Sequence, residues 1–177
     1  PHHERFVDAK NMRAVLKLFA LEFFKTGEGQ PLGHRILSES YPDFRLYPQE
    51  GKKFNADAAA EIVEDSAMRP VEGAKKLFAI SGFEQASALV QNKLLKTLEE
   101  PPEGVHFILG ACSLAPVLDT VKSRVKILEI PPFSCGQILA ALERQGKNPL
   151  NAAAAESANG ILGVAENMVA GGWFQQL

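Results

Sequence analysis

A pair of carboxylates stands near the end of a predicted amphipathic helix, in the string QNKLLKTLEEPP of residues 91–102. Glu99 and Glu100 fall in the last turn, where each negative charge opposes the helix dipole by roughly 0.3–1 kcal/mol. Such a pair could serve acid/base catalysis, but the sequence places no nucleophile and no second carboxylate pair with it. We therefore interpret Glu99 and Glu100 as an interface feature that pairs with basic groups nearby or on a partner. The alternative is that both are exposed and tolerated.

Basic side chains lie on this helix and in the segment that follows it. Lys93, Lys96 and Thr97 lie opposite its apolar stripe, and the simplest interpretation is a solvated helix face. Ser123-Arg124 ends a further predicted helical stretch. By position alone Arg124 is a surface arginine that interacts favourably with the dipole at a helix end.

Metal and thiol chemistry have little support in the sequence. Cys112 and Cys135 are far apart and form no CxxC pattern, so neither a zinc knuckle nor a disulfide framework is indicated. The segment 25–44 contains no cysteine, and His34 is an ordinary loop histidine. We predict no metal and no cofactor.

Length, composition and charge limit the kinds of protein that this sequence can form. With 177 residues, 46% of them hydrophobic, the chain suits one medium domain, or one domain with a small appendage. With a net charge of −2, the chain as a whole does not attract nucleic acid or an anionic membrane strongly by electrostatics. No run of 18 apolar residues and no signal-peptide pattern occurs, and we expect a cytoplasmic protein that does not contact membrane.

Short apolar runs alternate with helical patterns between Phe44 and Ile130. Strands are predicted at 44–47, 77–80, 105–109 and 125–130. Helices are predicted from a cap at Asn55 or Asp57 through Met68, at 91–100 and at 116–123. A deeply buried helix is predicted at 14–24, followed by a loop at 25–35. The alternation predicts an α/β fold with a parallel sheet flanked by helices.

The pattern changes after residue 132. Three helices, at 137–145, 150–158 and 161–169, follow one another without a strand. We therefore predict an α/β domain over 1–132, with an incomplete or degraded N-terminus, and a small all-helical lid subdomain over 133–177.

Several strings together resemble a known family. They are YPDFRLYPQEGKKF, RPVEGAKKLFAI, QNKLLKTLEEPPEGVHFIL and LDTVKSRV. They are similar to the delta-prime clamp-loader subunits of bacterial DNA polymerase III, a branch of the AAA+ P-loop family. The resemblance runs from about Tyr41 to Phe133, and more loosely beyond. It implies an AAA+ sheet followed by a helical lid.

The resemblance implies four nucleotide-binding elements, and none matches here. The family's acidic pair after its Walker B strand falls on Ser81-Gly82, although Glu84 follows two residues later. Its phosphate loop falls on residues 8–13, DAKNMR, where Lys10 alone could contact a nucleotide. The two sensor positions fall on Gly110-Ala111-Cys112 and Gly163-Val164. We therefore predict that the chain does not hydrolyse ATP and is no enzyme by itself.

One element of the family is kept. Ser123-Arg124 matches the SRC motif, with Val125 in place of cysteine. The resemblance implies that Arg124 acts catalytically in trans, reaching the γ-phosphate of ATP on a neighbouring subunit. A guanidinium is permanently charged and bidentate, which suits that task.

The implied function is that of a non-ATPase subunit in the loading of a sliding clamp onto primed DNA. The implied partners are the gamma/tau-like ATPase and the delta subunit, with the clamp and DNA reached through the complex. Lys93, Lys96 and Thr97 could then contact a neighbour or the DNA backbone. Two alternatives stay open: an active gamma/tau-type ATPase whose phosphate loop lies outside this sequence, and a repurposed AAA+-like interaction domain.

Overall fold

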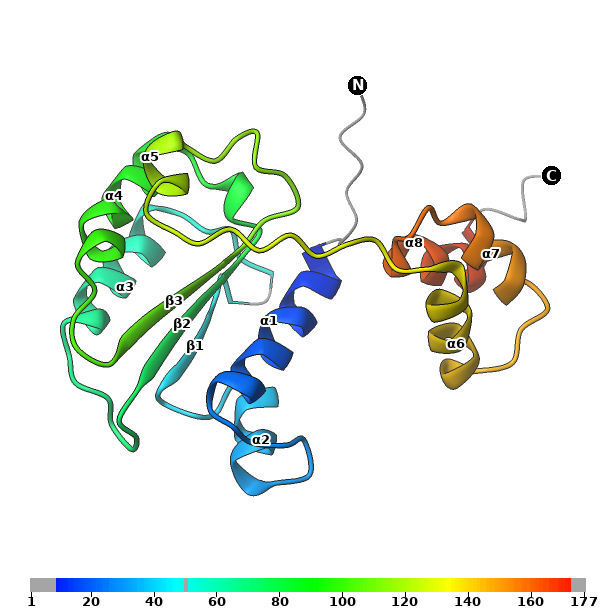
Figure 1. Ribbon diagram of the computed structural model, residues 1–177, viewed down its shortest axis with the longest axis horizontal. Helices are drawn as coiled ribbons and strands as arrows, with labels where there is room; N and C mark the ends of the chain where they lie inside the picture. Colours follow the sequence, from blue (N-terminus) through cyan, green and yellow to red (C-terminus); the bar gives the residue numbers. More distant parts are fainter. Residues whose placement is uncertain (1–8, 50, 173–177) are drawn as a thin grey trace. The chain divides into compact units, whose positions relative to one another are not determined.

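The computed structural model describes residues 9–49 and 51–172, and the chain divides into two compact units. Residues 12–127 form the α/β unit, and the described residues from Leu128 onward belong to a helical unit. Figure 1 shows the two units.

The α/β unit is built on a parallel sheet in the order β1-β2-β3. The strands are β1 (Phe44–Tyr47), β2 (Lys76–Ser81) and β3 (Val105–Gly110). Leu77 of β2 is in register with Phe44 on one side and His106 on the other. Every residue of β2 is buried, as expected for the middle strand of a sheet covered on both faces.

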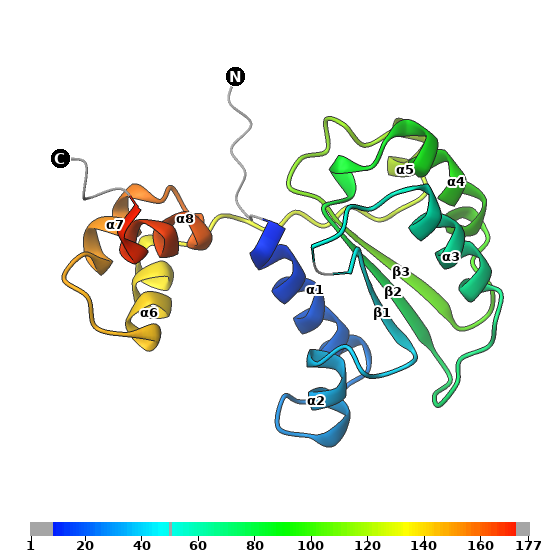
Figure 2. The ribbon, with the colours of Figure 1, turned by 180° about the vertical axis from the view of Figure 1, so that it is seen from behind.

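Helices cover the two faces of this sheet (Figures 1 and 2). One face carries α3 (Ala56–Ser66) and α4 (Ala88–Glu99), whose Ile62 and Leu94 pack in one core cluster with Phe78 and Ile80 of β2. The other face carries α1 (Ala9–Phe23) and α2 (Pro31–Leu37). A short 3₁₀ turn (Phe83–Gln85) follows β2, and the single-turn α5 (Asp119–Lys122) follows β3.

The helix starts follow from local chemistry. Asn55 caps α3 by accepting a hydrogen bond from the Ala58 amide at 3.0 Å, and Ser87 caps α4 by accepting one from Val90. Each cap satisfies an amide that has no partner within its helix. The three predicted strands at 44–47, 77–80 and 105–109 and the helix at 91–100 are confirmed.

Three predictions are wrong. Residues 125–130 form no strand, and Leu128 is 68% exposed, because alternating apolar residues make a strand only where a neighbouring strand offers hydrogen bonds. The loop predicted at 25–35 contains the start of α2, since Pro31 in its first turn favours helix. The helix predicted to be deeply buried, α1, leaves Leu18 52% exposed.

A buried carboxylate joins β1 to the segment before β2. Asp43 accepts hydrogen bonds from the backbone amides of Val71 (2.6 Å), Glu72 (2.9 Å) and Gly73 (2.8 Å). Burial raises the pKa of Asp43, but these three amides and the Tyr41 hydroxyl lower it further, so the pKa lies below the ordinary value. The charged form of Asp43 is therefore part of the folded structure.

Asp43→Asn is expected to lower the free energy of unfolding at pH 7 by about 2 kcal/mol, because an amide replaces a charged acceptor facing three donors. The pKa of Asp43 is depressed in the folded state, so its contribution is present above the unfolded pKa of about 3.9 and is lost as pH falls through the folded value. Urea unfolding of wild type and Asp43→Asn at pH 7 and pH 2.5 measures this. The difference between them should shrink at the lower pH, and the exposed-site control Glu103→Gln should match wild type at pH 7.

The helical unit contains α6 (Cys135–Gln145), α7 (Asn151–Ser157) and α8 (Leu162–Asn167), followed by a π-helical turn (Met168–Gly172). A capping box between Ser134 and Gln137 starts α6. Ile138 and Leu142 of α6 pack in one cluster with the small buried residues Ala154 and Ala155 of α7. The alanine run therefore allows the helices to pack tightly.

Candidate functional site

Arg124 directly follows Ser123, the C-cap residue of α5, and three groups of its own unit accept hydrogen bonds from it. Its Nε donates to Oε2 of Glu99 at 3.1 Å. Its Nη1 donates to the carbonyl oxygen of Thr120 at 2.8 Å and lies 3.4 Å from the Ser123 hydroxyl. The side chain is 29% exposed, so the guanidinium lies at the surface and not in the core.

The position of Arg124 follows from the helix that precedes it. The last carbonyls of any helix lack an intrahelical partner, and Arg124 supplies a donor to one of them, that of Thr120. Ser123 is the C-cap residue of α5. Within the described chain, Nη2 of Arg124 makes no hydrogen bond, so one nitrogen of the guanidinium still has donors available.

The two carboxylates at the end of α4 have different surroundings. Glu99 is the last residue of α4 and pairs with Arg124, while its side chain remains 56% exposed. Glu100 is the exposed C-cap residue of α4, and its side chain makes no hydrogen bond or ion pair within residues 9–49 and 51–172. Their role at a subunit interface stays a prediction.

The other candidates on α4 also differ. Lys93 is exposed and donates to the carbonyl oxygen of Ala56 at 3.2 Å, which joins α4 to the start of α3. Lys96 is exposed and Thr97 is half-buried. Of the two lysines, Lys96 is thus the one that the described part of the chain leaves without a side-chain hydrogen bond.

Gln91 is a buried polar residue that the sequence reasoning missed. It is 1% exposed, and its Nε2 donates to the carbonyls of Ala86 (2.9 Å) and Pro116 (3.0 Å). Its Oε1 accepts from the amide of Leu118 at 2.9 Å. Gln91 thereby fixes the loop that leads into α5 and Arg124. Its position on the stripe of Leu94 and Leu98, at helical spacing, was the available signal.

The carboxyl ends of the strands are where α/β folds bind ligands. At the end of β2, Ser81 is buried, and the next residue, Gly82, has a φ of 69°, which favours glycine. Glu84 is half-buried, and its carboxylate accepts a hydrogen bond from the amide of Cys112 at 3.3 Å, so it does not simply face solvent. The sulfur of Met12 would lie 2.6 Å from a Cβ at Gly110, so α1 fits tightly against the end of β3.

Most of the position that the resemblance assigns to a phosphate loop, residues 8–13, is helical. Ala9 to Arg13 form the beginning of α1. Asp8 and the side chain of Lys10 lie outside the described residues. Gly163 and Val164, at the second sensor position, lie in α8 of the helical unit.

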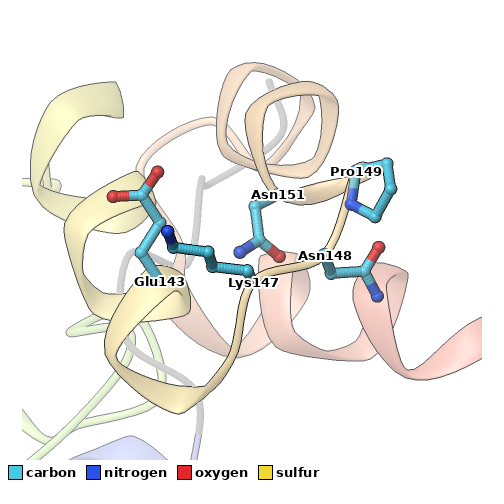
Figure 3. A pocket seen from close by; sticks show the side chains of 5 residues that line it. All are labelled: Glu143, Lys147, Asn148, Pro149 and Asn151. Carbon is cyan, nitrogen blue, oxygen red and sulfur yellow. The ribbon is translucent and has the colours of Figure 1, made fainter.

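A second candidate is an open hollow of about 520 Å³ in the helical unit, shown in Figure 3. Glu143, Lys147, Asn148, Pro149 and Asn151 line it. Asn151 donates to the carbonyl of Gly146 at 2.9 Å, while its buried Oδ1 has no partner in the described structure. Because that oxygen is covered, a ligand in the hollow cannot contact it without rearrangement.

Among the described residues, no group of three or more His, Cys, Asp or Glu is placed to hold a metal. Cys112 and Cys135 are free thiols. None of the described helices has the length and apolar character needed to cross a membrane.

The chain is similar in sequence to several known proteins. A family model described as DNA polymerase III, delta subunit, matches residues 16–134. The delta-prime subunit of Haemophilus influenzae is 32% identical over 142 residues, 73% of this chain and 43% of that protein. The Bacillus subtilis delta-prime subunit is 31% identical over 115 residues, 65% of this chain and 35% of its own length. A gamma subunit of Buchnera aphidicola is 30% identical over 82 residues, 46% of this chain and 22% of that protein.

A solved structure shows the fold. A DNA polymerase III gamma subunit-related protein from Thermotoga maritima matches with a TM-score of 0.51 and 19% identity, over 75% of this chain and 47% of that one. At this identity the likeness concerns the fold, and it confirms the predicted AAA+-like α/β class. The chain spans less than half the length of these relatives. On the family match and the Haemophilus relative, the chain belongs to the delta-prime family of DNA polymerase III clamp-loader subunits.

Proposed function

We propose that the chain acts within a non-ATPase, delta-prime-like subunit that presents Arg124 to ATP bound by a neighbouring ATPase subunit. In this proposal residues 1–132 form the AAA+-like domain and 133–177 the helical lid. The partners are a gamma/tau-like ATPase and a delta subunit, and the assembled complex loads the sliding clamp onto primed DNA. Ser123, beside Arg124, belongs to the same motif.

The observation that carries the proposal is the state of the Arg124 guanidinium. It is partly exposed, it is anchored through Nε and Nη1, and its Nη2 has no partner within the described chain. A surface arginine with unused donors can bind a phosphate oxygen presented by another molecule. A buried or fully paired guanidinium could not do so without losing its own contacts.

The carboxyl ends of the strands support the non-ATPase part of the proposal. The carboxylate of Glu84 lies against the amide of Cys112, where it would repel a triphosphate. Ser81-Gly82 provides one hydroxyl where the family has two metal-binding carboxylates, and a hydroxyl is a poor substitute for them. The contact of Met12 with Gly110 fills space at the end of β3.

A second candidate function is that of a gamma/tau-type ATPase, and the similarity to the Buchnera gamma subunit favours it. Its phosphate loop would have to lie outside this sequence. The surroundings of Ser81, Gly82 and Glu84 count against it. The third candidate, an interaction domain repurposed away from replication, predicts no association with clamp-loader subunits.

Titration with Mg-ATP distinguishes these candidates. We expect the full-length protein to show no heat of binding up to about 1 mM Mg-ATP, because it lacks both carboxylates for magnesium. A gamma subunit from the same source is the positive control in the calorimeter. Micromolar binding would favour the gamma/tau-type candidate. Failure to co-purify with the gamma/tau and delta subunits would instead support the interaction domain.

A further inference from the structure

We infer that Glu99 is a positioning residue for Arg124: it orients the guanidinium so that Nη2 faces the phosphate of a neighbouring subunit. The inference rests on the proposed function of Arg124 and extends it to a residue on a different helix. Glu99 touches no substrate in this view and acts through the arginine alone.

The contacts of Arg124 divide the guanidinium into a held part and an open part. Glu99 holds Nε at 3.1 Å, and the Thr120 carbonyl holds Nη1 at 2.8 Å. Two anchors on different nitrogens fix the plane of a rigid, planar group. The remaining nitrogen, Nη2, has no partner in the described chain, so the fixed plane also fixes where its two hydrogens point.

The two anchors come from separate elements. Glu99 is the last residue of α4, and Thr120 lies in α5. Without Glu99 only α5 and its C-cap residue Ser123, which directly precede Arg124, would hold the side chain. An arginine has several rotatable bonds, so one anchor leaves many rotamers while two anchors leave few. Glu99 thus reduces the ordering that Arg124 must undergo when a phosphate arrives.

The Glu99 carboxylate also repels an incoming phosphate. This repulsion would lower turnover, whereas the orientation of Arg124 by Glu99 would raise it. Glu99 is 56% exposed, so water and salt screen its charge. Its contact is with Nε, and the open nitrogen is a different one. We therefore expect orientation to outweigh repulsion, which makes the direction of the mutational effect a test.

The chain offers a matched control for this test. Glu103 lies in the turn after α4, is exposed, and makes no hydrogen bond or ion pair through its side chain in the part of the protein described. Glu99→Gln and Glu103→Gln each remove one negative charge, from the end of α4 and from the turn that follows it. Any general effect of charge on the surface should therefore be similar in the two variants.

The experiment measures ATP turnover in a loader reconstituted with the full-length subunit, with clamp and primed DNA present. Every ATPase subunit except the one adjacent to Arg124 carries a substitution that blocks ATP binding. Glu99→Gln is expected to lower kcat by about two- to fivefold, the range of an exposed ion pair. KM for ATP should stay unchanged, because the contact acts in the transition state. Glu103→Gln should match wild type.

A double variant separates positioning from a structural role. In an Arg124→Ala background, Glu99→Gln should cause no further loss, since its effect passes through the arginine. If Arg124→Ala abolishes turnover while Glu99→Gln equals Glu103→Gln, the inference about Glu99 is wrong and the proposed function stands. A rise in kcat for Glu99→Gln would also overturn it, because Glu99 would then restrain Arg124. If Arg124→Ala has no effect, the proposed function itself fails.

Discussion

Arg124→Ala is expected to lower ATP turnover at the adjacent subunit by about 10³-fold or more, the usual contribution of an arginine that stabilises phosphoryl transfer. The physical reason is that negative charge develops on the transferred group and the guanidinium neutralises it at the moment of transfer. The measurement is single-turnover hydrolysis in the loader that has one competent ATPase. Assembly of the complex should persist, because the side chain lies at the surface.

Two further variants define what this loss means. Arg124→Lys keeps the charge but loses the planar fork, so we expect it to recover only a small part of the rate. Lys126→Ala removes an exposed cation two residues away and should leave turnover unchanged. The loss of the Glu99 pair should change stability by roughly 0.2–1 kcal/mol, too little to explain the loss of rate by unfolding. Wild-type turnover in Arg124→Ala would refute the catalytic role.

Gln91→Ala is expected to lower the free energy of unfolding by about 3 kcal/mol, because it leaves three buried backbone groups without their partners. These are the carbonyls of Ala86 and Pro116 and the amide of Leu118. The substitution also leaves a cavity beneath the loop before α5. Urea unfolding followed by far-ultraviolet circular dichroism gives the value directly.

The neighbouring residue provides the control for Gln91. Asn92 is exposed on the same turn of α4, and Asn92→Ala should change the free energy of unfolding by no more than about 0.5 kcal/mol. Gln91→Glu keeps the size of the side chain, yet it should lower the free energy of unfolding by more than Gln91→Ala does. It places a charge in a buried site and removes both donated hydrogen bonds. A loss below about 1 kcal/mol in Gln91→Ala would show that the loop readily finds other partners.

The central strands and α4 could be predicted because their side chains follow regular periods. A continuous apolar run predicted β2, and helical spacing predicted α4. The run at 125–130 misled because its pattern is equally regular, while a strand also requires a neighbour that pattern alone does not guarantee. The start of α2 depended on Pro31, which favours the first turn of a helix as readily as a loop.

The sequence indicated the candidate residues but not the contacts between them. The motif indicated Arg124, and the position of Glu99 at a helix end indicated a basic partner. That the two pair with each other depends on how α4 packs against α5, across 25 residues of sequence. The hydrogen bonds of Gln91 to the loop have the same origin. Such contacts depend on tertiary packing, which local periodicity does not encode.

The hydrogen bonds of Asp43 constrain how the chain folds as it is synthesised. Their partners lie 28 to 30 residues further along, so they cannot form until that later segment has left the ribosome. The cap of α3, by contrast, joins residues three apart and can form as soon as they emerge. Until residues 71–73 have emerged, β1 has no partner strand and the Asp43 carboxylate lacks its three amide donors. Emergence of residues 71–73 from the ribosome is therefore the step at which Asp43 gains these partners.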